Sequence, residues 1–131
     1  MAVIPGTRVF VARLTGLSVF DPLGDQVGRV RDVVVTFGSN RGRPRVIGLV
    51  VEVPGRRRVF VPMTRVMSID PGQVITTGLV NMRRFEQRPS ETLVAAELFD
   101  RAVGARTPDG DVEGVVEDIA IEQNARRDWN V

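Results

Sequence analysis

Residues 45–62 read RVIGLVVEVPGRRRVFVP, and this stretch decides the fold. The first half is a nearly continuous apolar run of strand length that is rich in β-branched residues, which indicates a buried β-strand. Pro54-Gly55 is a turn signal, and residues 57–62 resume the strand pattern. The stretch therefore predicts a β-hairpin whose turn carries the consecutive arginines Arg56, Arg57 and Arg58.

Further strand signals lie at short intervals on both sides of this hairpin. Residues 8–14 and 27–37 precede it, and residues 73–77 follow it after the turn Asp70-Pro71-Gly72. Thirteen glycines and eight prolines supply many turns, and the abundant valines favour pleated, half-buried surfaces. We predict a mainly all-β fold, with a small barrel over residues 8–80.

The sequence contains an internal repeat. Residues 22–33 (PLGDQVGRVRDV) realign 86 residues later with residues 108–119 (PDGDVEGVVEDI). In each copy the first shared glycine permits the positive φ of a tight turn, and the second marks a bulge or a close approach of backbones. The shared aspartate is expected to bind backbone or an arginine at the bend. These structural positions are Gly24, Gly28 and Asp32 in the first copy and Gly110, Gly114 and Asp118 in the second.

The second copy looks incomplete. Residues 81–92 are polar and read as a linker, and Ser90 is a candidate N-cap for a short helix over residues 91–99. Residues 93–131 form a truncated second copy, because only thirteen residues follow Asp118 and the strands that would complete it are missing. Open strand edges favour self-association. Unless a longer natural chain supplies those strands, we expect a homodimer with residues 93–131 at or near the interface.

The residue types on which much enzyme chemistry depends are absent. The chain has no His, Cys, Lys or Tyr, which excludes an imidazole base, a thiolate nucleophile and a Schiff-base lysine. The aspartates of the repeat could be read as ligands for a hard cation, but capping of turns is the favoured reading. We predict no catalytic residue, no cofactor and no metal, with a carboxylate-pair hydrolase as the least favoured alternative.

The charge is unevenly distributed. Residues 1–80 hold eleven arginines and five acids, whereas residues 81–131 hold seven arginines and eleven acids. Arg56, Arg57 and Arg58, with Arg43 and Arg45 beside a second turn, are candidates for binding phosphate groups. The favoured interpretation is a solvated turn that pairs with acidic segments, because exposed aromatic residues are not interleaved. Two aromatic residues in polar contexts, Phe85 and Trp129, are candidates for partner anchors or buried caps.

The chain shows no signal for membrane insertion. Its longest uncharged run, residues 71–82, has twelve residues, against the roughly 18 that a spanning helix needs. The N-terminus lacks the charged and then apolar pattern of a signal peptide. We therefore expect a cytoplasmic location.

The order and spacing of these elements resemble the PRC-barrel family. The resemblance rests on residues 16–19 (GLSV), the glycine-containing hairpin 21–33, residues 48–51 (GLVV) and residues 60–62 (FVP). It implies a small β-barrel, and the family shares no catalytic site that could be carried over.

Residues 8–22, 48–66 and 81–93 are more similar still to the N-terminal part of certain actinobacterial proteins. Those proteins join PRC-barrel segments to domains like the intracellular part of MgtE-type magnesium transporters. This resemblance implies a non-enzymatic cytosolic adaptor or regulatory module, linked to magnesium transport or sensing, with the other domains of a longer chain as partners. The alternative is an RNA- or ribosomal-protein-binding module like the C-terminal domain of ribosome maturation factors, so nucleic acid is the less favoured partner.

Overall fold

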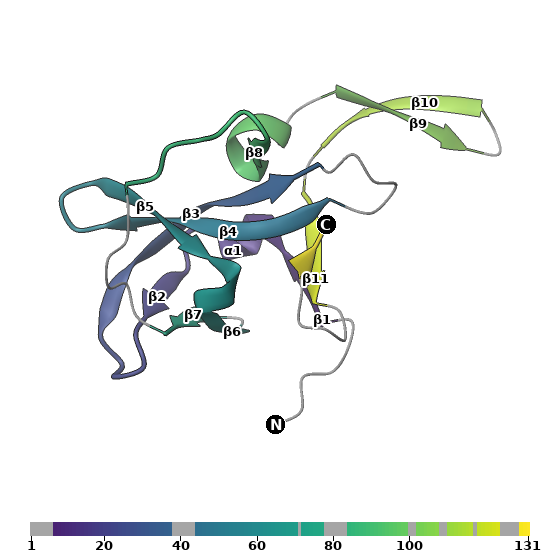
Figure 1. The fold of residues 1–131 in the computed structure, drawn as a ribbon. Helices are drawn as coiled ribbons and strands as arrows, with labels where there is room; N and C mark the ends of the chain where they lie inside the picture. Colours follow the sequence, from purple (N-terminus) through teal and green to yellow (C-terminus); the bar gives the residue numbers. More distant parts are fainter. Residues whose placement is uncertain are drawn as a thin grey trace.

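The computed structural model describes residues 7–37, 44–70, 72–77, 84–99, 102–107, 110–116, 118–123 and 129–131. Strands dominate and the helical segments are short turns, so the predicted mainly all-β class is confirmed (Figure 1). The strands and turns of the first half are β1 (Thr7–Phe10), α1 (Val11–Leu14), β2 (Ser18–Phe20), β3 (Gln26–Thr36), β4 (Arg45–Val53), β5 (Arg57–Pro62), η1 (Met63–Arg65), β6 (Val66–Asp70) and β7 (Gln73–Thr76). Those of the second half are β8 (Glu91–Leu93), η2 (Val94–Leu98), β9 (Ala102–Thr107), β10 (Gly110–Val115), β11 (Ala120–Gln123) and β12 (Trp129–Asn130).

The long strands β3 and β4 form the centre of the main sheet. They pair antiparallel, and each has different neighbours at its two ends. β3 pairs with β2 near its start and with β8 at its end, while β4 pairs with β12 at Arg45 and with β5 over its second half. β7 adds in parallel to β2, and β6 pairs with β7. The changes of neighbour let one sheet bend around a single core.

The core is built largely from valine. Side chains alternate between the two faces of β3 and β4, and Val33, Leu49 and Val51 point to the same face. There they form one apolar cluster with Val11 and Leu14 of α1. Val34 and Val50 are as completely buried but lie outside this cluster. They occupy the opposite face of the two strands, where Phe60 of β5 lies across from Val50. Both faces of the central strands therefore carry buried side chains.

Two glycines of the first repeat copy behave as predicted. Gly24 adopts a φ of +88° in the turn before β3. Gly28 lies where β3 approaches β4 so closely that an added Cβ would overlap the carbonyl oxygen of Glu52 and lie 2.8 Å from Cγ1 of Val51. At Gly48, which the sequence did not mark as a close approach, an added Cβ would overlap the ring of Phe60.

The two repeat copies form hairpins in the same register. In the first, Val19 of β2 lies opposite Gly28 of β3, and in the second, Val103 of β9 lies opposite Gly114 of β10. Gly110 is the first residue of β10, and the two residues before it lie outside the described part of the chain. The predicted sequence repeat is thus also a repeat of strand pairing.

The copies also exchange strands with each other. β1, which precedes the first copy, pairs antiparallel with β11 of the second, and β8, which precedes the second copy, pairs antiparallel with the end of β3. The two pairings have corresponding registers. Val34 lies opposite Leu93, the residue before η2, and Ala120, which is equivalent to Val34 in the repeat, lies opposite Phe10, the residue before α1. The chain therefore folds as an internally exchanged pair of similar units.

Each copy's aspartate caps the helical turn of the other copy. Asp32 accepts the backbone N–H groups of Ala95 at 2.7 Å and Ala96 at 2.9 Å. Asp118 accepts the backbone N–H of Ala12 at 2.9 Å. The first N–H groups of a helical turn have no partner within it, and a carboxylate satisfies them. The sequence left backbone or an arginine as the partner of both aspartates, and it did not indicate that the bonds cross between copies.

Two expectations about the second copy are corrected. The predicted helix over residues 91–99 is shorter, because residues 91–93 pair with the open edge of β3, and Asp32 takes the capping role expected of Ser90. The second copy also finds strand partners, since β11 pairs with β1 and β12. The boundaries 8–80, 81–92 and 93–131 stay predictions, and strands from both outer segments join one sheet.

The crossed capping bonds predict unequal losses of stability. Asp32 is only 5% exposed, whereas Asp118 is exposed. Asp32→Ala leaves two part-buried donors unpaired, and we expect it to lower the free energy of unfolding by about 2–4 kcal/mol. Asp118→Ala should cost about 0.5–2 kcal/mol, as an ordinary lost cap does. Urea unfolding of both variants measures this, and an Asp32→Ala protein as stable as the parent would contradict the assignment.

Candidate functional site

The β4–β5 hairpin places arginines at one end of the sheet. Its turn contains Gly55 with a φ of +88° and Arg56 with a φ of +58°. A positive φ is uncommon outside glycine and is used where a chain must reverse tightly. Arg57 and Arg58 follow as the first two residues of β5, and all three arginine side chains are exposed.

Neighbouring strands add more arginines around one carboxylate. Arg29 of β3 and Arg58 of β5 both lie opposite Glu52 of β4, and cross-strand partners share a face of the sheet. Arg31 donates to Oε2 of Glu52 at 2.9 Å, and Nε of Arg58 lies 4.0 Å from its Oε1. The hydrogen bond from Arg31, with the charges of Arg31, Arg58 and Arg56, lowers the pKa of Glu52 against the opposing effect of desolvation. Glu52 therefore stays ionised and is outnumbered by cations.

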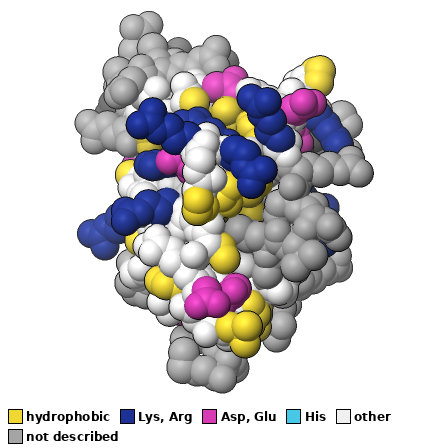
Figure 2. Space-filling model, turned by 90° about the vertical axis from the view of Figure 1, so that its left-hand side faces the viewer, with side chains coloured by type: hydrophobic (Ala, Val, Ile, Leu, Met, Phe, Trp, Pro, Cys, Tyr) yellow, Lys and Arg dark blue, Asp and Glu magenta, His cyan; other side chains and the backbone are white. Residues whose placement is uncertain are grey.

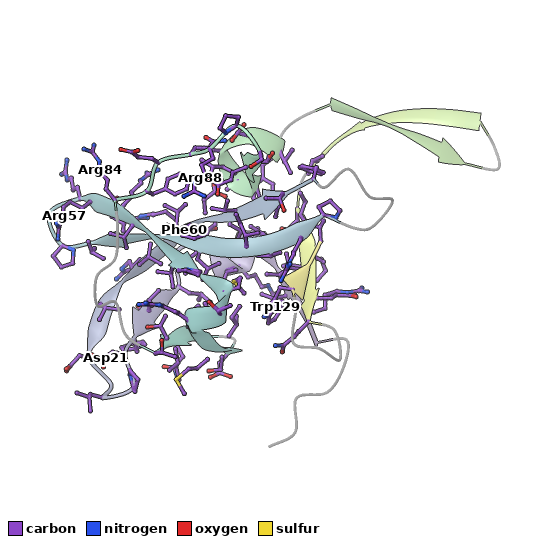
Figure 3. All side chains as sticks on the ribbon, in the orientation of Figure 1. Asp21, Arg57, Phe60, Arg84, Arg88 and Trp129 are labelled. Atoms are coloured by element: carbon purple, nitrogen blue, oxygen red, sulfur yellow. The ribbon has the colours of Figure 1, made fainter. Side chains whose placement is uncertain are left out.

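The segment that begins at Arg84 runs along the outer edge of β5. Phe85 donates its backbone N–H to the carbonyl of Arg58 at 2.7 Å, and Arg84 forms a β-bridge with Val59. The ring of Phe85 stacks on that of Phe60, with centroids 6.4 Å apart and planes inclined by 27°. These contacts hold Arg84 near the arginines of β5 (Figure 3).

Two hollows flank the hairpin. One, of about 500 Å³, lies between β4–β5 and the segment after Arg84, with Phe60 and Phe85 in its lining and Arg84 and Arg88 beside them. The other, of about 490 Å³, lies between β3 and the hairpin turn and is lined by Arg29, Arg31, Glu52, Arg56 and neighbouring residues. Each hollow thus combines cationic groups with apolar or backbone surface.

We call this region the arginine surface and define it by Arg29, Arg31, Arg56, Arg57, Arg58, Arg84 and Arg88 together with Phe60 and Phe85. Basic side chains gather on this side of the molecule with hydrophobic side chains between them (Figure 2). The acids that line the two hollows are Glu52, Glu86 and Glu91. Within the described residues, no ion pair joins Arg57 or Arg84 to an acid. The surface therefore presents uncompensated positive charge.

The structure divides the predicted binding residues. Arg56, Arg57 and Arg58 belong to the arginine surface, but Arg45 lies at the opposite end of β4, where it pairs in register with Asn130. Arg43 lies outside the described residues.

Sequence reasoning missed the arginines that neighbouring segments contribute. Arg29 and Arg31 flank Val30 in an alternating pattern that could have marked a charged strand face. Arg84 and Arg88 lie in the stretch interpreted only as a linker. Their position depends on the contact of this stretch with β5, and the local sequence does not predict that contact.

The two candidate aromatic anchors differ in environment. Trp129 is 7% exposed and belongs to the core cluster, so it is a buried cap. Phe85 is half-buried against Phe60.

Asp21, one of the aspartates that could be read as a metal ligand, caps a turn. Asp21 accepts the backbone N–H groups of Leu23 at 3.0 Å and Asp25 at 2.9 Å, which is the capping role favoured from sequence. Across the described ranges, no group of three or more acidic, His or Cys side chains is placed to hold a metal ion.

Comparison with known protein families decides the classification. Residues 6–79, more than half of the chain, match the PRC-barrel domain. The chain belongs to the PRC-barrel family. Residues 92–131, which hold the second copy from β8 to β12, match a family described as the actinomycetes SH3 domain. No curated protein matches the chain.

Membership in the PRC-barrel family confirms the resemblance to that family found in the sequence. The PRC-barrel domain is a general protein-interaction module, and both matched domain types are non-catalytic binding modules. In the part of the chain that the structure describes, no helix has the length and apolar character to cross a membrane.

The lowered pKa of Glu52 predicts a pH-dependent contribution to stability. A carboxyl group whose pKa is lower in the folded state stabilises the fold above its ordinary pKa, and this contribution is lost as the pH falls through the lowered value. Glu52→Gln should therefore reduce the free energy of unfolding at about pH 7, and its difference from the parent should shrink towards about pH 3. Urea unfolding at a series of pH values checks this. A difference that does not change with pH would contradict the role of the charge.

Proposed function

We propose that this PRC-barrel protein is a non-catalytic adaptor that binds an acidic protein segment on the arginine surface. The observation that carries the proposal is the convergence of arginines from β3, the β4–β5 hairpin and the segment after Arg84 around two stacked phenylalanines. These segments are remote in sequence. Their meeting at one place favours a binding role over a set of unrelated solvated side chains.

The chemistry of the surface suits carboxylates. A guanidinium group binds a carboxylate with two parallel hydrogen bonds and keeps its charge at any physiological pH. Glu52 engages Arg31 and Arg58 but leaves the more peripheral Arg57 and Arg84 without a described ion pair. An incoming acidic segment would supply the missing negative charge.

The apolar component suits a protein ligand. Phe60 and Phe85 form an aromatic wall beside Arg84 and Arg88 in the larger hollow. Partly buried aromatic residues next to arginines are typical of the energetic centre of protein interfaces. An acidic segment with apolar side chains fits this combination better than a purely anionic ligand.

The wider role rests on the resemblance to actinobacterial proteins that join PRC-barrel segments to domains like the intracellular part of MgtE-type transporters. We propose that the module belongs to a larger cytosolic protein linked to divalent-cation transport or sensing, and the neighbouring domains of the full-length gene product test that link. RNA binding is the alternative, which the following titration also tests.

Binding of a fluorescent peptide of alternating glutamate and leucine measures the proposed activity. We expect fluorescence anisotropy to show binding that weakens with added salt, and no binding of the same peptide with glutamine in place of glutamate. Arg57→Glu combined with Arg84→Glu should weaken binding at least about tenfold, equal to about 1.4 kcal/mol.

The matched control is Arg13→Glu, compared with Arg57→Glu alone. It makes the same single charge change at an exposed position of α1 and should leave binding within about twofold, less than about 0.5 kcal/mol. Equal weakening by these two single variants would reduce the effect to net charge and contradict a defined site. Tighter binding of a single-stranded RNA than of the acidic peptide, lost in the Arg57→Glu, Arg84→Glu protein, would favour the alternative function.

A further inference from the structure

The β9–β10 hairpin is the part of the second copy that the chain leaves uncovered. Its strands pair only with each other among the described residues, and the hairpin extends away from the main sheet (Figure 1). The equivalent hairpin of the first copy is covered on both sides, because β4 pairs with β3 and β7 pairs with β2. The second hairpin therefore presents strand edges that its counterpart does not.

The uncovered hairpin is acidic. The sequence of residues 102–115 contains three acids and one arginine. In the hairpin register Arg106 lies opposite Asp111, whereas Glu113 lies opposite Gly104 and has no cation across from it. A net negative charge disfavours pairing of two such hairpins edge to edge. It complements a surface that is rich in arginine.

The hairpin and the arginine surface of one chain lie at opposite ends of the molecule. The arginine surface surrounds the β4–β5 turn, whereas the hairpin follows η2 and projects beyond the end of β3 (Figure 1). Opposite charges at two ends of one chain are paired most simply by a second copy of that chain.

We propose that the acidic β9–β10 hairpin docks on the arginine surface of a second copy of this chain. The second copy returns its own hairpin to the arginine surface of the first. A reciprocal exchange of this kind closes into a two-fold dimer and leaves neither contact open for growth into a filament. The inference rests on the proposed function, because it identifies the acidic partner of the arginine surface as a second copy.

The test is the oligomeric state of charge-reversed variants in sedimentation velocity over a range of protein and salt concentrations. The parent should dimerise, and salt should weaken the dimer. Arg57→Glu with Arg84→Glu should weaken association at least tenfold, and so should Asp111→Arg with Glu113→Arg. An equimolar mixture of the two double variants should form a dimer again, because each supplies the charge that the other now requires.

Controls keep folding and net charge apart from docking. Arg13→Glu, and Asp70→Arg with Asp25→Arg, make charge reversals of the same kind at exposed positions outside the docking elements and should still dimerise. Circular dichroism reports folding of each variant. If a reversed variant unfolds, the milder pair Glu113→Gln and Arg57→Gln replaces it, with an expected weakening of about threefold each.

Three results would overturn the inference. They are a parent that stays monomeric at the highest concentration, a dimer that neither reversal weakens, and a mixture of the two variants that stays monomeric. The second result would point to pairing of strand edges instead. Failure here is distinct from failure of the proposed function, because the peptide titration uses dilute protein and would still show an acidic peptide bound at Arg57 and Arg84.

Discussion

One carboxylate from each repeat copy holds the first helical turn of the other copy, and the rest of the structure depends on this crossed contact. Asp32 lies at an irregularity of β3, between the part of the strand that pairs with β2 and the part that pairs with β8. By accepting the N–H groups of Ala95 and Ala96, it fixes η2 beside β3, with Val94 of η2 buried in the core cluster. Asp118 makes the equivalent bond to Ala12, and so ties α1 to the second copy.

The candidate site lies directly before the crossed contact in the chain. The segment before β8 runs along β5, where Phe85 stacks on Phe60 and Arg84 joins the arginine surface. The two family matches fall on separate stretches of sequence, yet the units share strands. The arginine surface itself is built from the first unit and from the segment that joins the two matched stretches.

The sequence allows the local features to be predicted and leaves the long-range ones undetermined. The roles of Gly24 and Gly28 can be predicted because turn geometry and close backbone approach restrict the residue type at single positions. The hairpin with Arg56, Arg57 and Arg58 can be predicted from its strand pattern and its turn residues. The pairing of β1 with β11 cannot be predicted, because a repeat shows that two segments are similar without showing which strand completes which copy. Arg84 is a second example, since its place in the site follows from its contact with β5 and not from its neighbours in sequence.

Native-state hydrogen exchange tests the crossed contact most directly. The informative amides are those of Ala95 and Ala96, bound to Asp32, and that of Val11, bound to the carbonyl of Ile119 at 2.8 Å. If the copies depend on each other, these amides exchange only through global unfolding, with the same free energy as the amides in the centre of β3 and β4. If residues 91–123 instead open in a separate step of lower free energy while β1 to β7 keep their protection, the copies fold independently and the account is wrong.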